Sequence, residues 1–239
     1  MRVTRKGIYS ASVAARISGT KRHSTRVVLA LPGAHRHPFE TGLIADMARR
    51  VATLGDFLAP GAGVDAWMYT SQTHRLPELR LSQAAGWIAD WAVLPREPLL
   101  SQDAARGNLL TQHTARYELF GPEDAAEAIR GIMRSLPENE GPTLVLFFIW
   151  GFHSDGPYMA DELEGASGEN VFWQFVGDTG TGSSVLDHLD RLRAEAPHIS
   201  NVNLYQGWDS IQDTPDYLFF RGVLKPFVRW RKALPQMRS

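Results

Sequence analysis

Two short apolar segments constrain the fold of this chain more than any other feature of its sequence. The first spans residues 26–31 and ends at Pro32-Gly33, and the second spans residues 144–150 and ends at Gly151. Apolar runs of this length, bounded by turn residues, are typical of strands buried inside a parallel sheet. Both are far shorter than the roughly 18 to 20 apolar residues that a membrane-spanning helix needs.

Helical and strand patterns alternate along the rest of the chain. Apolar residues recur at helical spacing over residues 43–58, and Pro60-Gly61 ends that pattern. Further helices are predicted over residues 122–136, 158–166, 185–194 and from Pro215 onward. The buried face of the last helix is expected to carry Tyr217, Phe220, Leu224 and Phe227. Further strands are predicted over residues 64–70, 170–177 and 202–205, with residues 74–79 as an antiparallel partner at the sheet edge. The weakly periodic residues 95–121 are expected to be mainly irregular.

This alternation predicts an α/β fold. We expect a doubly wound, mostly parallel sheet with one antiparallel edge strand and helices on both faces. In such sheets ligands bind at the carboxyl ends of the strands, where the strand order reverses. Three loops are expected at that edge: residues 32–41, about 111–123 and 151–156.

Composition is that of an ordinary globular protein. The chain has 239 residues, of which 44% are hydrophobic and 21% charged, so intrinsic disorder is excluded. It has no cysteine, which removes thiol catalysis and thiolate metal sites. The N-terminus lacks the apolar segment of a signal peptide. We therefore expect a soluble, cytoplasmic protein with no membrane partner.

Positive charge is concentrated at the N-terminus. The first acidic residue is Glu40, and every charged residue before it is Lys or Arg. We interpret residues 1–25 as a basic arm that packs on, or extends from, a single domain formed by residues 26–239. Tyr9 is the one aromatic residue among these charges, so a surface that stacks nucleic-acid bases is not supported.

Several segments resemble a known family. Residues 170–177 (NVFWQFVG) and residues 65–70 (DAWMYT), the latter followed by His74-Arg-Leu-Pro77, are similar to strands of von Willebrand factor A (vWA) domains. The resemblance is to the type found with bacterial tellurium (toxic-cation) resistance proteins. A final helix containing Phe227 and Trp230 fits the same family, and the resemblance covers nearly the whole chain.

The resemblance implies a metal-ion-dependent adhesion site built from three loops. The Asp-x-Ser-x-Ser positions of the first loop fall on Ala30, Pro32 and Ala34, and the Asp-Gly pair of the third falls on Trp150-Gly151. The second loop should supply a Thr near residues 121–124, where this chain has none. Magnesium requires oxygen ligands, which these side chains lack. We therefore predict a retained scaffold with a degenerate metal site.

Histidine and aromatic residues occupy the same loops, and two interpretations stay open. In the first, the loops form a partner-binding surface from His35, His37, Trp150, Phe152 and His153. In the second, imidazoles rebuild a zinc or nickel site from His35, His37, His113 and His153.

These observations predict a non-enzymatic protein-interaction module without a cofactor. The resemblance implies that it binds a protein partner in a bacterial stress-response or multi-component assembly. The alternative is a sensory or catalytic site that depends on zinc or nickel. The Gly-rich residues 177–182 lack the lysine of a nucleotide-binding P-loop, so nucleotide binding is disfavoured.

Overall fold

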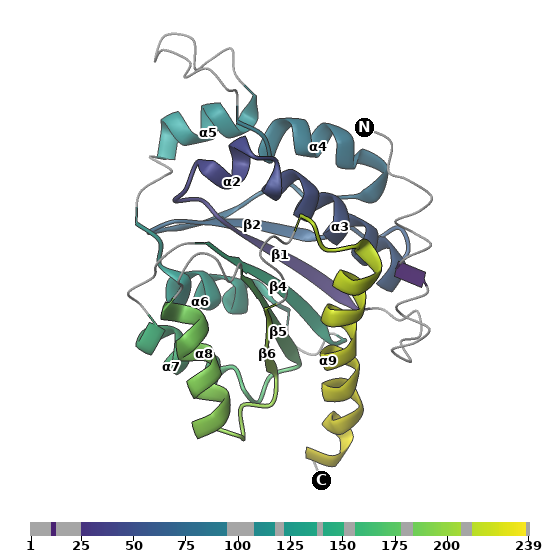
Figure 1. The fold of residues 1–239 in the computed structure, drawn as a ribbon, viewed down its shortest axis with the longest axis vertical. Helices are drawn as coiled ribbons and strands as arrows, with labels where there is room; N and C mark the ends of the chain where they lie inside the picture. The colour runs from purple at the N-terminus through teal and green to yellow at the C-terminus, as the bar shows by residue number, and fades with distance from the viewer. Residues whose placement is uncertain are drawn as a thin grey trace.

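A computed structural model describes most of the chain: residues 11–12, 25–94, 108–117, 122–137, 141–150, 156–177, 184–206 and 212–237. Its strands form one sheet in the order β3-β2-β1-β4-β5-β6 (Figure 1). The strands are β1 (Arg26–Pro32), β2 (Asp65–Tyr69), β3 (Thr73–Arg75), β4 (Thr143–Ile149), β5 (Val171–Gly177) and β6 (Val202–Gln206).

The pairing confirms the predicted α/β fold. The pair β2–β3 is antiparallel, and the other pairs are parallel. Successive strands are added outward from β1 on one side and from β4 on the other, so the strand order reverses between β1 and β4. In the register of that central pair, Val28 lies opposite Val145 and Ala30 opposite Phe147.

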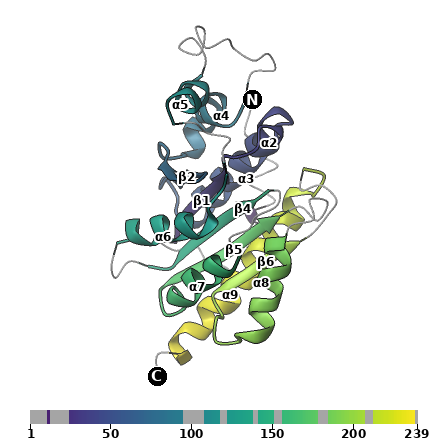
Figure 2. The same cartoon turned by 90° about the vertical axis from the view of Figure 1, so that its left-hand side faces the viewer.

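Helices cover both faces of the sheet, as predicted. One face carries α3 (Leu43–Leu58), α4 (Ala84–Trp91) and α9 (Asp216–Met237), and the other carries α6 (Ala125–Ser135), α7 (Gly156–Gly165) and α8 (Ser184–Glu195) (Figures 1 and 2). Side chains of β1 alternate between them, with Leu29 packed toward α3 and α9 and Val28 toward α6. Every residue of β4 is buried, which explains why its sequence is apolar after Thr143.

The prediction that residues 95–121 are mainly irregular is wrong for part of that range. Residues 109–117 form a helix, α5 (Leu109–Tyr117), while residues 95–107 and 118–121 lie outside the described part of the chain. The Asn108 side chain accepts hydrogen bonds from the backbone N–H and the hydroxyl of Thr111, at 3.0 and 2.7 Å. Its amide also donates to the carbonyls of Ala89 and Val93. A cap and a contact with α4 therefore define this helix where periodicity is weak.

The next helix begins later than predicted. Pro122 was expected in its first turn, but α6 begins at Ala125 with Asp124 as its N-cap. The Asp124 carboxylate accepts a 2.7 Å hydrogen bond from the backbone N–H of Glu127. Three short helical elements at α2 (His37–Glu40), η1 (Leu81–Gln83) and α4 were also not predicted.

The final helix packs through the face that the sequence predicted. Phe220, Leu224 and Phe227 are fully buried, and Tyr217 is half-buried against the same core. Ala11, in the N-terminal arm, is also fully buried in this core. None of the described helices is long and apolar enough to cross a membrane.

An ion network fixes the start of α9 to α3. Arg50 is 3% exposed and lies 2.9 Å from an Asp46 oxygen and 3.1 Å from an Asp216 oxygen. It also donates to the Thr214 carbonyl at 2.9 Å. Burial lowers the pKa of Arg50, and the two carboxylates oppose that shift. Arg49 joins the network through Asp46 and Asp216, and buried charges of this kind require all of their partners.

We expect Asp216→Asn to destabilise the protein by about 3 kcal/mol, because it leaves the buried Arg50 without one of its two carboxylates. Urea unfolding measures the change. The control is Glu78→Gln, which breaks an exposed ion pair with Arg80 and should cost less than about 1 kcal/mol. Equal losses in the two variants would show that the network does not hold α9 in place.

Candidate functional site

The candidate site lies at the carboxyl ends of β1 and β4, where the strand order reverses. We call its described part the rim: residues 33–41, 122–124 and Trp150. Figure 1 shows α2 and the start of α6 at this edge, and Figure 2 turns the edge toward the viewer. Open α/β sheets bind ligands at this position.

Hydrogen bonds join the first and second loops of the rim. The backbone N–H of Gly33 donates to the Tyr69 carbonyl at 2.8 Å. The backbone N–H of Ala34 donates to a Glu123 carboxylate oxygen at 3.0 Å, across 89 positions of sequence. The N–H of Asp124 donates to the Thr70 carbonyl at 2.9 Å. Side-chain and backbone groups of the chain itself therefore bring the loops together.

Gly33 is required for this close approach. A Cβ atom at Gly33 would lie 2.9 Å from the Thr70 methyl carbon and 3.1 Å from the Tyr69 carbonyl oxygen. Backbone oxygen cannot move aside as the end of a flexible side chain can, so a larger residue would push the first loop away from β2.

Tyr69 fills the space beneath the rim. Its side chain is fully buried, and its hydroxyl donates to the Phe148 carbonyl at 2.6 Å. Its ring lies 4.8 Å from that of Phe147, measured between centroids. This side chain therefore connects β2 with β4, while β1, which runs between them, contributes the small side chain of Ala30 to the same core.

The residues that the resemblance aligned with metal-ligand positions do not fit magnesium. Ala30 and Pro32 are buried, Ala34 and Trp150 are half-buried, and none carries a side-chain oxygen. The carboxylates nearby have structural contacts, since Glu123 accepts from Ala34 and Asp124 caps α6. This donor set differs from the hard oxygen ligands in octahedral geometry that magnesium needs.

The structure brings together two of the predicted site residues, His37 and Trp150. Their ring centroids are 6.2 Å apart with the planes tilted by 35°. His37 is exposed, and Trp150 is half-buried against the core on the α3 and α9 face. The neighbouring Phe39 is fully buried and anchors α2. His35 is also exposed on this loop.

Of the other predicted residues, the structure places His113 in a different environment. His113, expected in the second loop, lies within α5, where its ring is 5.3 Å from that of His74 and 5.4 Å from that of Trp91. Phe152 and His153 lie outside the described residues. Within the part of the chain that is described, no three His, Asp or Glu side chains form a group able to hold a metal ion.

Three residues of this region were not singled out from the sequence. Glu123 and Tyr69 act through contacts with distant segments, which a local pattern does not reveal. Tyr158, in the first turn of α7, is 68% exposed. In the sequence, an aromatic residue near a helix start is only a weak indication of a binding residue. The exposure of Tyr158 strengthens that indication because α7 begins at the edge of the sheet that carries the rim.

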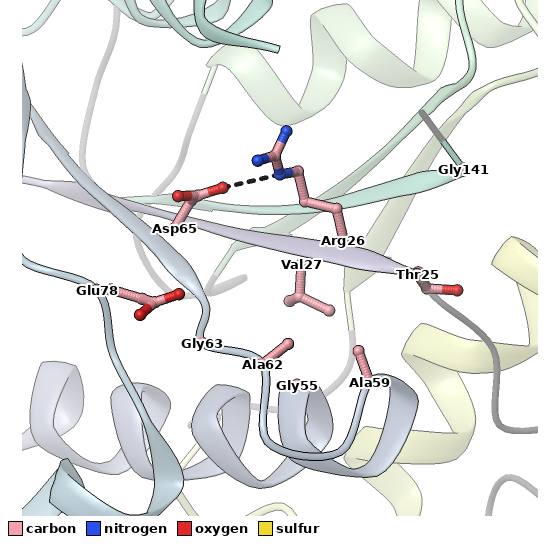
Figure 3. Close-up of a pocket in the computed structure, with 10 residues that line it drawn as sticks. All are labelled: Thr25, Arg26, Val27, Gly55, Ala59, Ala62, Gly63, Asp65, Glu78 and Gly141. Atoms are coloured by element: carbon pink, nitrogen blue, oxygen red, sulfur yellow. Dashed lines mark ion pairs between the residues drawn. The ribbon is translucent and has the colours of Figure 1, made fainter. Parts of the chain in front are cut away.

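A hollow lies at the opposite, amino-terminal edge of the sheet. It has a volume of about 260 Å³ and is lined in part by Arg26, Asp65 and Glu78 (Figure 3). Figure 3 shows Arg26 and Asp65 pointing toward each other, and their ion pair measures 3.0 Å. Asp65 also pairs with Arg75, and Glu78 pairs with Arg80. Since its charges are already paired within the chain, this hollow is a weaker candidate than the rim.

The comparison with protein families agrees with this geometry. The model of the vWA-TerF-like family, described as the vWA domain found in the TerF C terminus, matches residues 22–238. The chain belongs to the vWA-TerF-like family. The resemblance proposed from residues 65–70 and 170–177 is thereby confirmed.

Individual relatives are distant. The chain is 23% identical over 209 residues to the uncharacterized protein YcbR of Bacillus subtilis. The aligned residues make up 86% of this chain and 76% of YcbR. A structure of proximal thread matrix protein 1 from the mussel byssus has a TM-score of 0.50 at 11% identity. That match covers 85% of this chain and 47% of the mussel chain, so this chain spans about half of its length. The likeness concerns the fold alone.

We expect Tyr69→Phe to lower the free energy of unfolding by about 1 to 2 kcal/mol. The variant leaves the buried Phe148 carbonyl without its donor while keeping the ring in place. Chemical denaturation measures the loss, and amide exchange at the ends of β1 and β4 should increase. Tyr217→Phe, on the half-buried face of α9, is the matched control. A Tyr69→Phe variant as stable as the wild type would contradict the role of this hydrogen bond.

Stability should also depend on His74. Burial lowers the pKa of His74 below its ordinary value, so the unfolded chain takes up this proton at a higher pH than the folded one. Both states are neutral at pH 8, and the free energy of unfolding should fall as the pH drops below about 6.5. His74→Gln should show a smaller loss between pH 8 and 5.5 in urea titrations. The same pH dependence in both proteins would refute this assignment.

Proposed function

We propose that this vWA-TerF-like domain is a non-enzymatic protein-interaction module that binds its partner at the rim. The observation that carries the proposal is the pairing of the half-buried Trp150 with the exposed His37, on loops that hydrogen bonds hold in place. Tryptophan is enriched among the residues that dominate binding energy at protein interfaces. A pre-ordered surface also loses little conformational entropy when it binds.

Partner binding here is proposed to be independent of a metal ion. We infer that the adhesion site of the family is degenerate in this chain, because Ala30, Pro32, Ala34 and Trp150 offer no ligand oxygen. The hydrogen bond from Ala34 to Glu123 would then join the loops that a bound ion would otherwise join. Recognition would rest on shape, the Trp150 indole and the exposed imidazoles.

The surface extends, in this proposal, over the third loop and the start of α7. Phe152 and His153 follow Trp150 directly in the sequence. Tyr158 supplies an exposed aromatic ring at the start of α7. Aromatic residues flanking a half-buried tryptophan are typical of interfaces with a dry centre and a polar margin.

The wider setting is proposed from the family. Its model is named for TerF, and the resemblance to toxic-cation resistance proteins favours a place in a bacterial stress-response or multi-component assembly. Family membership is an associational argument. We also propose that the basic arm, residues 1–25, packs on the domain, which the burial of Ala11 in the main core supports.

We expect Trp150→Ala to weaken partner binding about tenfold or more, because it removes a central apolar anchor. A photo-crosslinking amino acid at position 37 captures the partner in cells that make the protein, and mass spectrometry quantifies it. The same amino acid at position 78, at the opposite edge of the sheet, should not capture that partner.

The matched control is Leu234→Ala. Leu234 is a half-buried side chain that packs against the same core as Trp150 but lies near the end of α9. Both variants should stay folded by circular dichroism, and Leu234→Ala should keep full capture at position 37. A folded Trp150→Ala variant that captures as much partner as the wild type would refute the proposed surface.

A further inference from the structure

The outer face of α9 carries a row of positive charges. Arg221, Lys225, Arg229 and Lys232 are all exposed, and their spacing of four, four and three residues places them on one side of the helix. With a rise of 1.5 Å per residue the row is about 16 Å long. We call these four residues the basic stripe. The chain as a whole has a net charge of −1, so the stripe is a local excess.

The stripe is uncompensated, unlike other charges of the fold. Arg49 and Arg50 on α3 pair with Asp46 and Asp216, and Arg130 on α6 pairs with Glu127 and Glu162. None of the four stripe residues forms an ion pair in the described part of the chain. Asp216 is the single acidic residue of α9, and it faces α3.

Helix stability does not explain this arrangement. Like charges four residues apart destabilise a helix, and the stripe contains two such pairs, Arg221–Lys225 and Lys225–Arg229. Positive charge in the last turns is favoured by the helix dipole, but Arg221 lies in the second turn of the 22-residue helix and Lys225 near its middle. The row therefore lowers the stability of α9 where alternating charges would raise it.

The surroundings of the stripe disfavour an inserted membrane contact and a single-stranded nucleic acid. A helix that lies on a membrane inserts an apolar face, but the apolar face of α9 is buried against the sheet through residues such as Phe220 and Phe227. The described large apolar side chains that are exposed are Val93, Leu109 and Tyr158, none of them on α9. Single-stranded nucleic acid needs exposed aromatic rings for stacking, which the described surface of α9 does not offer.

We propose that the basic stripe docks an acidic helical segment of another protein. A helix with carboxylates at the same spacing of about 6 Å presents them in a matching line, as charged residues do along paired helices. The contact would be electrostatic, because no apolar side chain accompanies the charges, and therefore sensitive to salt. The stripe lies on a helix that covers a face of the sheet, apart from the rim (Figures 1 and 2), and this inference does not rest on the rim.

The test uses a labelled helical peptide with Glu at positions 1, 5, 9 and 12 in an Ala and Gln background, followed by fluorescence anisotropy. We expect binding at low ionic strength that weakens as salt is added. Arg229→Glu should weaken it about fivefold or more, because a repelling charge replaces an attracting one. The variant should be at least as stable to heat as the wild type, since the new carboxylate would lie between Lys225 and Lys232, so the loss cannot come from unfolding.

The matched control is Arg134→Glu. Arg134 is an exposed residue in the last turn of α6, on the other face of the sheet, and its reversal should change peptide affinity less than about twofold. A peptide with the same number of Glu residues at non-helical spacing should bind more weakly. Equal loss in the two variants, equal binding of the two peptides, or tighter stripe-dependent binding of a DNA duplex would each overturn the proposal.

Discussion

The parallel pairing of β1 with β4 is the constraint on which the rest of this structure depends. The pairing places Ala30 opposite Phe147 and creates the point where the strand order reverses. Strands added outward from this pair bring the ends of β2 and β4 to one edge, where Tyr69 connects them through the Phe148 carbonyl. The loop after β1 can then reach Glu123. The position of the rim therefore follows from the topology, and hydrogen bonds within the chain join its loops.

The sequence was informative where burial leaves a periodic pattern. The strands β1 and β4 and the buried face of α9 at Phe220 and Leu224 were predicted because helices bury both faces of the strands, and the sheet buries one full face of the helix. The short helix α5 was not, because the cap at Asn108 and contacts with α4 define it. The roles of Glu123 and Tyr69 could not be predicted for the same reason. Each depends on a partner about 80 to 90 positions away in the chain.

Charge is distributed differently over three regions of the molecule. The buried guanidinium of Arg50 and the half-buried carboxylate of Asp216 hold α9 against α3. The exposed cations of α9, from Arg221 to Lys232, remain available to a partner, while the rim offers aromatic and imidazole groups. A net charge near zero conceals this separation. A scaffold with two separate surfaces can contact two partners at once, which suits a component of an assembly.

The central proposal is that hydrogen bonds of the chain itself hold the rim together and that the rim has no magnesium site. Isothermal titration calorimetry of the chelator-treated protein with magnesium, manganese, zinc and nickel tests it directly, with the rim signals of Ala34 and Trp150 followed by NMR. We predict no binding at the rim and unchanged signals for all four ions. Magnesium or manganese binding that shifts the Ala34 amide and disappears in Glu123→Gln would contradict the account. So would zinc or nickel binding that is lost when His35 and His37 are replaced.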